Sequence, residues 1–344
     1  MTIQYAKNQP AGFKNRIERV AIIGASGQVG RPITDALLQT GKHIVTVITR
    51  SDSQNKLPEG VKVAQVNYEE EATLVEALKG QQVLIISLAV TAAPDTQAKI
   101  ISAAAKAGVP HVMPNAWGGD TQNKKLAAEN LTGEAYLAGI QNIEDSGIFW
   151  TNLCCSFWYE YSLALPFAYG FDVPNKKVTF YDDGNVRINT STWQQCGRAV
   201  ASFLSLKALP EDENDKSPTV SAWHNKSLYV SSFLLSQREM LDSIQRVQGT
   251  TDADWQITHE PVVERYKRGL DMLQAGDRNG FGIALYARTF FPGGDGDYEH
   301  SRGLDNDILG LPKEDLDKAT ARSLHMSGSD WNPFASRTNA KIYD

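Results

Sequence analysis

The sequence lacks the features that mark several classes of protein. Its longest apolar run, residues 83–90, is far shorter than the roughly 20 residues that a membrane-spanning helix needs. The polar start, residues 1–15, has no apolar core like that of a secretory signal, so we expect a cytoplasmic protein. The formal net charge of -6 leaves no cationic excess for binding nucleic acid. These absences favour a small molecule as the ligand, with neither a membrane nor a nucleic acid as partner.

Residues for several kinds of chemistry are also scarce. The three cysteines, Cys154, Cys155 and Cys196, have a count and spacing that suit neither a disulfide framework nor a zinc site, so we expect buried, reduced thiols. The histidines are too scattered to predict a metal site, and His111 falls inside an expected strand, where a structural role is favoured. Neither a Gly-x-Ser-x-Gly elbow nor a phosphate-binding lysine motif occurs, which argues against hydrolases and kinases.

What the first half does contain is an alternation of apolar β-branched runs and helical patterns. The run Val83-Leu84-Ile85-Ile86 is apolar on both faces, as a strand must be when helices cover both sides of a parallel sheet. We therefore predict an α/β fold with a Rossmann-type, doubly wound parallel sheet. Its strands are expected at residues 20–24, 44–49, 83–90, 109–113 and 148–154, and its helices at 31–40, 72–78, 97–107 and 127–146.

The second half suggests a smaller lobe. An aromatic segment, residues 157–171, has no clear period and is interpreted as the start of a substrate-binding part. Residues 228–231 form a candidate late strand that returns to the sheet, so the C-terminal lobe is expected to be partly interleaved with the first. The predicted organisation is a tail (1–17), a nucleotide-binding domain (18–156) and a mainly substrate-binding lobe (157–344). The sequence leaves the oligomeric state open, a homo-oligomer being one option.

The strongest local signal is a glycine pattern between the first expected strand and helix. Gly24 permits a turn too tight for a Cβ atom, Gly27 lets the backbone approach a pyrophosphate, and Gly30 lets the helix pack closely on the strand. The N-terminus of the helix would then face the anionic phosphates. The pattern and its position predict a dinucleotide site.

The end of the second expected strand bears on the choice of cofactor. An NAD-preferring site would have Asp or Glu there for the ribose hydroxyls, whereas this chain has Thr49-Arg50-Ser51. Arg50 can pair with a 2′-phosphate, and Thr49 and Ser51 can hydrogen-bond to it, although Asp52 follows closely. We therefore predict NADP(H).

The sequence resembles the NmrA-like and isoflavone-reductase-like branch of the atypical short-chain dehydrogenases. The resemblance rests on the glycine pattern, on Met113-Pro114-Asn115-Ala116-Trp117-Gly118, on Cys196-Gly197-Arg198-Ala199-Val200-Ala201 and on Val230-Ser231-Ser232, in the same order as in the family. It covers roughly residues 18–270. It implies NADP(H) across the strand ends, with these cofactor-binding residues: Gly24, Ser26, Gly27, Gln28, Val29, Gly30, Thr49, Arg50, Ser51, Ser87, Leu88, Asn115, Trp117, Ser156 and Phe157.

The chain departs from the family where the chemistry is done. The lysine that the family's reductases carry before the strand at Ile148 falls on Tyr136 here. No tyrosine has a lysine four residues later, so the Tyr-x-x-x-Lys pair of ordinary short-chain dehydrogenases is missing too. Asn115-Ala116-Trp117 replaces the family's Ser-Glu-Phe. The resemblance therefore supports cofactor binding more strongly than hydride transfer by the family's route.

Four residues are candidate catalytic groups. Tyr136 is either a proton donor beside the cofactor or a packing tyrosine. Asp120, after the Gly118-Gly119 turn, is either an acid/base or a cap. Tyr159 and Glu160 lie in the aromatic segment and would either wall the pocket or face solvent.

Three functions are compatible with these residues. The first is an NADPH-dependent reductase of an aromatic or heteroaromatic secondary metabolite. The second is a non-redox enzyme on the same scaffold, such as a Pictet-Spengler-type ring closure of an indole in alkaloid biosynthesis, which the missing lysine favours. The third is a dinucleotide-sensing regulator, since one scaffold hosts many functions.

Overall fold

The computed structural model describes residues 4–53, 55–89 and 92–327. Its centre is a seven-stranded sheet with the order β11-β6-β5-β4-β1-β2-β3, in which every neighbouring pair is parallel. The strands are β1 (Arg19–Ile23), β2 (Ile44–Arg50), β3 (Lys62–Val66), β4 (Val83–Ile86), β5 (His111–Met113), β6 (Phe149–Cys154) and β11 (Lys226–Tyr229). The order reverses between β1 and β4, which is the point where open α/β sheets bind their ligands.

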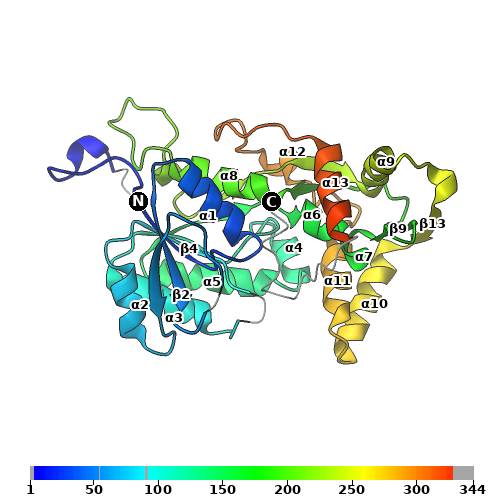
Figure 1. The fold of residues 1–344 in the computed structure, drawn as a ribbon, viewed down its shortest axis with the longest axis horizontal. Coiled ribbons are helices and arrows are strands. Elements are labelled where there is room, and N and C mark those ends of the chain that lie inside the picture. Colours follow the sequence, from blue (N-terminus) through cyan, green and yellow to red (C-terminus); the bar gives the residue numbers. More distant parts are fainter. Residues whose placement is uncertain (1–3, 54, 90–91, 328–344) are drawn as a thin grey trace.

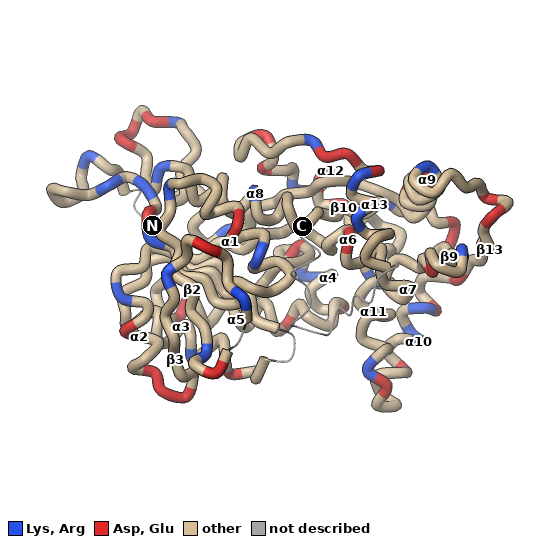
Figure 2. The backbone as a smooth tube through the Cα atoms, viewed as in Figure 1, with Lys and Arg blue, Asp and Glu red and all other residues tan. Residues whose placement is uncertain are grey.

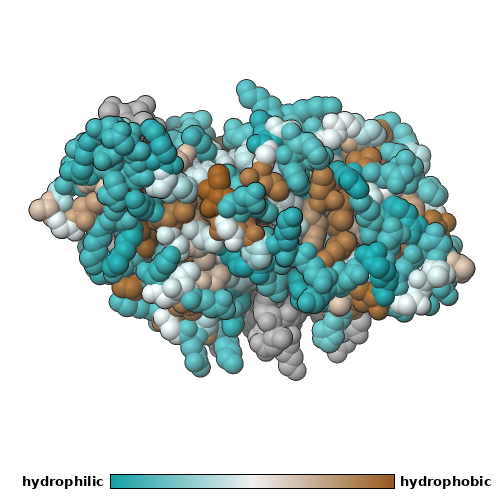
Figure 3. All heavy atoms as spheres, turned by 90° about the horizontal axis from the view of Figure 1, so that it is seen from above, coloured by the Kyte–Doolittle hydropathy of each residue, from teal (hydrophilic) through white to brown (hydrophobic). Residues whose placement is uncertain are grey.

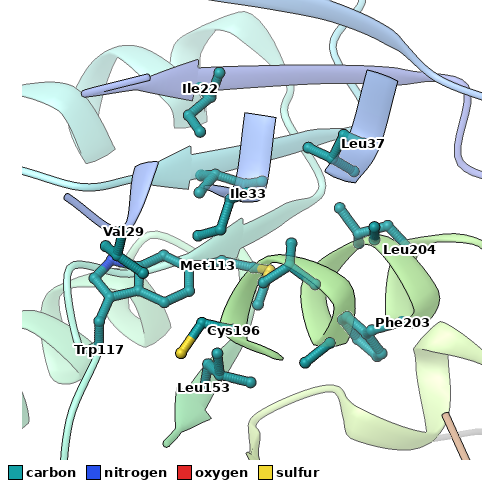
Figure 4. Close-up of a cluster of buried hydrophobic side chains, with 14 of the residues drawn as sticks. Ile22, Val29, Ile33, Leu37, Met113, Trp117, Leu153, Cys196, Phe203 and Leu204 are labelled. Carbon is teal, nitrogen blue, oxygen red and sulfur yellow. The ribbon is translucent and has the colours of Figure 1, made fainter. Parts of the chain in front are cut away.

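One face of the sheet is covered by α1 (Gly30–Gln39) and α8 (Trp193–Leu204). Figure 4 shows Ile33 and Leu37 of α1 among the apolar side chains that fill this layer, together with Phe203 and Leu204 of α8. The two helices touch closely at Gly197, where a Cβ atom would stand 2.4 Å from the carbonyl oxygen of Pro32. The helix that follows the glycine-rich loop, α1, therefore packs against a segment more than 150 residues later in the chain.

The other face is covered by α2 (Glu71–Leu78), α3 (Thr96–Ala107) and α5 (Gly133–Asp145). Side chains of β4 alternate between the two layers, since Val83 and Ile85 belong to the cluster under α1 while Leu84 and Ile86 belong to the cluster under α3. The doubly wound parallel sheet predicted from this apolar run is confirmed.

Two elements differ from the expectation. The helix expected over residues 127–146 is broken into α4 (Lys124–Glu129) and α5, because the Asn130 side chain accepts a hydrogen bond from the backbone N–H of Thr132 (3.0 Å). The edge strand β3 was not predicted. Three of its five residues are exposed, and Lys62 and Gln65 interrupt the apolar run by which the inner strands were found.

The remaining elements form a smaller lobe with its own core, on the right of Figure 1. It holds two three-stranded sheets, β7 (Phe157–Trp158) with β10 (Arg187–Ser191) and β12 (Phe233–Ser236), and β8 (Phe171–Asp172) with β9 (Lys177–Tyr181) and β13 (Gln256–Glu260). Its helices are α6 (Tyr159–Leu163), α7 (Pro166–Tyr169), α9 (Gln237–Gln248), α10 (Val262–Gln274), α11 (Asn279–Thr289), α12 (Tyr298–Arg302) and α13 (Leu316–Ser327).

The two parts are interleaved, as expected. The chain leaves the large sheet after β6, builds β7 to β10, and then returns to supply α8 and β11. β11 pairs with β6 in parallel, with Leu228 beside Leu153. The expected return of a late strand is therefore found, at Lys226–Tyr229.

Figure 2 shows acidic and basic residues distributed along the backbone of both parts. The face seen from above is mostly hydrophilic, with scattered hydrophobic patches (Figure 3). Across the described ranges, no helix is both long enough and apolar enough to pass through a bilayer. All three cysteines are buried and free, as predicted.

His111 lies at the start of β5 and is buried. Its Nε2 is 2.9 Å from the Thr151 hydroxyl oxygen, and because that hydroxyl donates to the carbonyl of Trp223, the histidine must be the donor. Its Nδ1 has no hydrogen-bond partner within the described part of the chain. Burial, reinforced by nearby His224, lowers the pKa of His111 to about 3, so the ring is neutral in the folded protein.

We predict that this histidine makes the fold acid-sensitive. Below its ordinary pKa of 6.5 the unfolded chain takes up a proton that the folded chain refuses, so stability is lost as the pH falls toward 3. Between about pH 6.5 and 5 the loss from this group is about 2 kcal/mol. Urea denaturation at pH 7 and pH 5 should show a smaller pH effect in His111→Gln than in the native chain. Equal losses of stability between pH 7 and pH 5 in the two proteins would contradict the role of His111 in acid sensitivity.

Candidate functional site

The glycine-rich loop joins β1 to α1 at the carboxyl edge of the sheet. Gly24 has φ +83°, and a Cβ atom there would stand 1.8 Å from the carbonyl oxygen of Ser87. A Cβ atom at Gly30 would stand 2.0 Å from the carbonyl oxygen of Gly24. These two glycines are required by the packing of the chain itself.

Gly27 is different, because packing does not require it to be a glycine. It is exposed, and the one atom outside its chain neighbours that a Cβ would approach is the oxygen of Gly24, at 3.1 Å. Val29, the residue before α1, provides no side-chain cap, and the first turn of the helix contains no acidic residue. The loop thus combines an open backbone with an uncapped helix N-terminus, an arrangement that suits an anion.

The end of β2 lies beside the end of β3. Thr49 is half-buried there, whereas Arg50 and Ser51 are exposed. The Nε atom of Arg50 is 3.5 Å from a carboxylate oxygen of Asp52, and the two side chains are 64% and 74% exposed. The predicted phosphate-binding arginine therefore forms a solvent-exposed pair, which is readily opened.

The ends of β4 and β5 are tied together by side chains predicted to contact a cofactor. The Asn115 side chain accepts from the backbone N–H of Leu88 (3.0 Å), and the Ser87 N–H donates to the carbonyl of Ile23 (3.0 Å). The Trp117 indole donates to the carbonyl of Ile86 (2.8 Å) and is buried among the side chains shown in Figure 4. The structure brings these residues together next to the glycine-rich loop.

A small cavity lies where β6 ends against the C-terminal lobe. The backbone N–H groups of Cys155 and Ser156 both donate to the carbonyl of Gly118, and Ser156 has φ +54°. Phe157 follows and stacks on Tyr286, with ring centroids 3.9 Å apart. The cavity holds about 20 Å³ and is lined by Gly119, Asp120, Leu126, Asn130, Ser156, Phe157, Thr289, Asp295, Gly296 and Tyr298. That volume fits about one water molecule, so a larger ligand requires the lining to move.

Asp120 lines this cavity with its carboxylate almost fully buried. One oxygen accepts from the Tyr229 hydroxyl (2.8 Å) and from the backbone N–H of Gln122 (2.9 Å), and the other accepts from Arg302 (3.0 Å). These three donors occupy both oxygens of the carboxylate. Asp120 is thus better arranged as a hydrogen-bond acceptor than as a proton donor.

Tyr136 projects from α5 toward the turn that follows β5. Its hydroxyl oxygen lies 3.8 Å from the position that a Cβ atom would take on Gly118. Burial raises the pKa of the Tyr136 phenol, opposed by a hydrogen bond with the Thr132 side chain, so the phenol keeps its proton at neutral pH. Tyr136 therefore lies beside Gly118, the residue before Gly119 of the cavity lining, and does not itself line the cavity.

Tyr159 and Glu160 are placed in the interior, neither on the cavity lining nor in solvent. The Tyr159 hydroxyl hydrogen-bonds to Thr320 of α13 (2.8 Å), and burial raises its pKa. The Glu160 carboxylate pairs with Arg322 (3.0 Å), also of α13. Burial raises the pKa of Glu160 as well. Their contacts are those that dock α13 on α6, because a buried polar group needs a partner.

Residues 119–130 form the roof segment of the cavity, and the C-terminal lobe clamps it. Besides the Asp120–Arg302 pair, Asn123 donates to Asp295 (2.8 Å) and Asp295 pairs with Arg288 (2.8 Å). The fully buried Arg288 also pairs with Glu129 at the end of α4. These arginines were missed in the sequence because their partners lie 159 and 182 residues away, and no local pattern connects them.

Comparison with known proteins identifies the family of the chain. The model of the NmrA-like family matches residues 16–187, which is half of the chain, and the chain belongs to that family. The protein named oxidoreductase aprR from Aspergillus flavus is 28% identical over 314 residues, covering 89% of this chain and 98% of that protein.

Solved structures share the fold. A crystal structure from a study of pinoresinol-lariciresinol and phenylcoumaran benzylic ether reductases aligns with a TM-score of 0.71 at 20% identity, covering 89% of this chain and 99% of that one. The Escherichia coli NADPH-dependent quinone oxidoreductase QOR2, solved with NADPH, aligns with a TM-score of 0.61 at 17% identity over 89% and 99% of the two chains. The isoflavone-reductase-like resemblance stated from the sequence is confirmed.

We predict that the clamp controls opening of the roof segment. Glu129→Gln leaves the Arg288 guanidinium with a weaker partner, so local opening should become about 5-fold more frequent, the equivalent of about 1 kcal/mol. Trypsin cleavage after Lys124 or Lys125, both exposed within α4, measures that opening, because a protease needs an unwound helix. Glu134→Gln, which changes an exposed carboxylate outside these pairs, is the control. Equal cleavage rates in the two variants would show that the clamp does not control opening of the roof segment.

Proposed function

We propose that this chain is an NADP(H)-dependent reductase of an aromatic or heteroaromatic secondary metabolite. The observation that carries the proposal is the glycine-rich loop, in which Gly27 is open to an approaching ligand while Gly24 and Gly30 are fixed by packing. Arg50 at the end of β2 supports the phosphorylated cofactor, because a guanidinium binds a phosphate through paired hydrogen bonds. The oxidoreductase names of the relatives and the NADPH-bound neighbour point to the same class.

The cofactor would lie along the carboxyl edge of the sheet. Its phosphates would be held by backbone N–H groups of residues 26–30, with the Ser26 and Gln28 side chains next to them. Its nicotinamide end would reach the strand ends at Ser87, Leu88 and Asn115, close to Ser156 and Phe157. When bound, NADPH supplies a hydride. The residues named here supply binding and orientation.

The substrate would enter the cavity under the roof segment. Phe157 and its stacked partner Tyr286 offer a flat apolar wall for an aromatic ring. Asp120 would accept a hydrogen bond from the substrate, because this residue lines the cavity. Tyr136 is the candidate proton donor, because its phenol carries a proton at neutral pH and lies beside Gly118 at the edge of the sheet.

One observation favours a second function. Tyr136 stands where the family's reductases have a lysine, so the scaffold has lost the usual catalytic cation. A non-redox ring closure of the Pictet-Spengler type needs an acid and a base beside a flat pocket, and it does not need hydride. Tyr136 and Asp120 would fill those roles.

The cofactor site is tested by a pair of glycine variants. Gly27→Ala should leave the chain folded, because its added methyl meets one atom at 3.1 Å, and should weaken NADPH binding about 10-fold or more by obstructing the pyrophosphate. Gly30→Ala should instead destabilise the fold, because its methyl would stand 2.0 Å from a backbone oxygen. Thermal denaturation and calorimetric titration separate the two effects. Native-like NADPH affinity in Gly27→Ala would refute the proposed phosphate site.

The reaction class is tested with deuterium. NADPH labelled at nicotinamide C4 should transfer its label to the product of a reductase, whereas a cyclase would leave the label on the cofactor. Tyr136→Phe removes a single hydroxyl and should lower turnover roughly 100-fold if that phenol is the acid, with NADPH affinity unchanged. A candidate panel of aromatic ketones, enones and imines provides the substrates. Turnover within about twofold of the native value would reduce Tyr136 to a packing residue.

A further inference from the structure

Residues 49–52, at the end of β2, include side chains suited to two different cofactors. Arg50 is the last residue of the strand, and Asp52 follows two positions later. Their side chains meet, with Arg50 Nε 3.5 Å from Asp52 Oδ1. A guanidinium suits a ribose 2′-phosphate, whereas a carboxylate in this region suits the ribose hydroxyls of NAD(H).

Arg50 and Asp52 occupy an open part of the sheet edge. Ser51 donates its backbone N–H to the carbonyl of Val66 (3.3 Å), which fixes this segment against the end of β3. Both charged side chains remain mostly exposed. Tyr68, just beyond β3, is close enough for the charge of Arg50 to act on its phenol. Arg50 therefore has a defined backbone position and a mostly exposed side chain that is paired with Asp52.

The ion pair itself is weak, and its two members respond oppositely to a phosphate. Exposed pairs contribute little, so Arg50 can leave Asp52 at small cost. A phosphomonoester carries roughly −1.5 to −2 charges at neutral pH, so it attracts Arg50 and is repelled by Asp52. The ribose hydroxyls of NAD(H) are uncharged donors, and they would be accepted by Asp52 without that repulsion.

We propose that Asp52 is a specificity-determining residue that limits the preference for NADP(H), so that the chain also binds NAD(H). The inference rests on the proposed dinucleotide site. Arg50 favours NADP(H) by attracting the 2′-phosphate, and Asp52, two residues later, disfavours NADP(H) by repelling it. The resulting preference is modest, and it falls as ionic strength rises because both charges are exposed to solvent.

The test measures dissociation constants of NADPH and NADH by calorimetry for the native chain, Asp52→Asn and Arg50→Gln, at low and high salt. The native chain should bind both cofactors and bind NADPH more tightly. Asp52→Asn removes the repelling charge with little change in shape, so it should raise the preference for NADPH about 10-fold at low salt. Arg50→Gln should abolish the preference. Asp145→Asn, at the C-terminal end of α5, controls for the change in net charge.

The outcomes separate the two proposals. If Asp52→Asn changes the affinities for NADPH and NADH by the same factor, or leaves both unchanged, the role of Asp52 is overturned while the dinucleotide site stands. An equal gain in NADPH preference in Asp145→Asn would overturn it too, because a general charge effect would then explain the result. If the native chain binds neither cofactor, the dinucleotide site and the inference both fall.

Discussion

The structure depends on a crossing of backbones at Gly24. The carbonyl of Ser87 at the end of β4 occupies the space where a side chain on Gly24 would be, and the carbonyl of Gly24 does the same to Gly30. Because no side chain intervenes, β1, β4 and the first turn of α1 converge within a few ångströms. This convergence places the N-terminus of α1 at the edge of the sheet where β5 and β6 also end, and Asn115 and Ser156 follow those two strands.

The local sequence pattern was sufficient to predict strands that are buried on both faces and a helix that has one apolar face. β1, β4 and α1 were predicted because an apolar run or a 3.6-residue period records how each is covered. β3 has one partner strand and exposed side chains, so its sequence carries no such record. The break between α4 and α5 depends on hydrogen bonds that the Asn130 side chain accepts from Thr132, which a helical pattern does not reveal.

The proposed cofactor side of the site follows from local sequence, whereas the proposed substrate side does not. The glycine pattern and Arg50 are contiguous with strand ends, so their position follows from the order of elements. The substrate side is assembled from contacts across the chain, such as Arg302 with Asp120 and Arg288 with Glu129. Tyr159 and Glu160 were sensible candidates by type, but their partners on α13 turn them inward. A residue's chemistry can be read locally, while its direction is fixed by distant neighbours.

The return of the chain through α8 and β11 has a consequence during synthesis. Until residues 193–229 leave the ribosome, α1 has no helix beside it and β6 is an open edge. The nascent first half thus presents Ile33, Leu37 and unpaired strand groups to solvent or to chaperones for as long as the intervening lobe is being translated. The large sheet is therefore the first part of the fold to be translated, but it is completed only when the chain has been translated as far as β11.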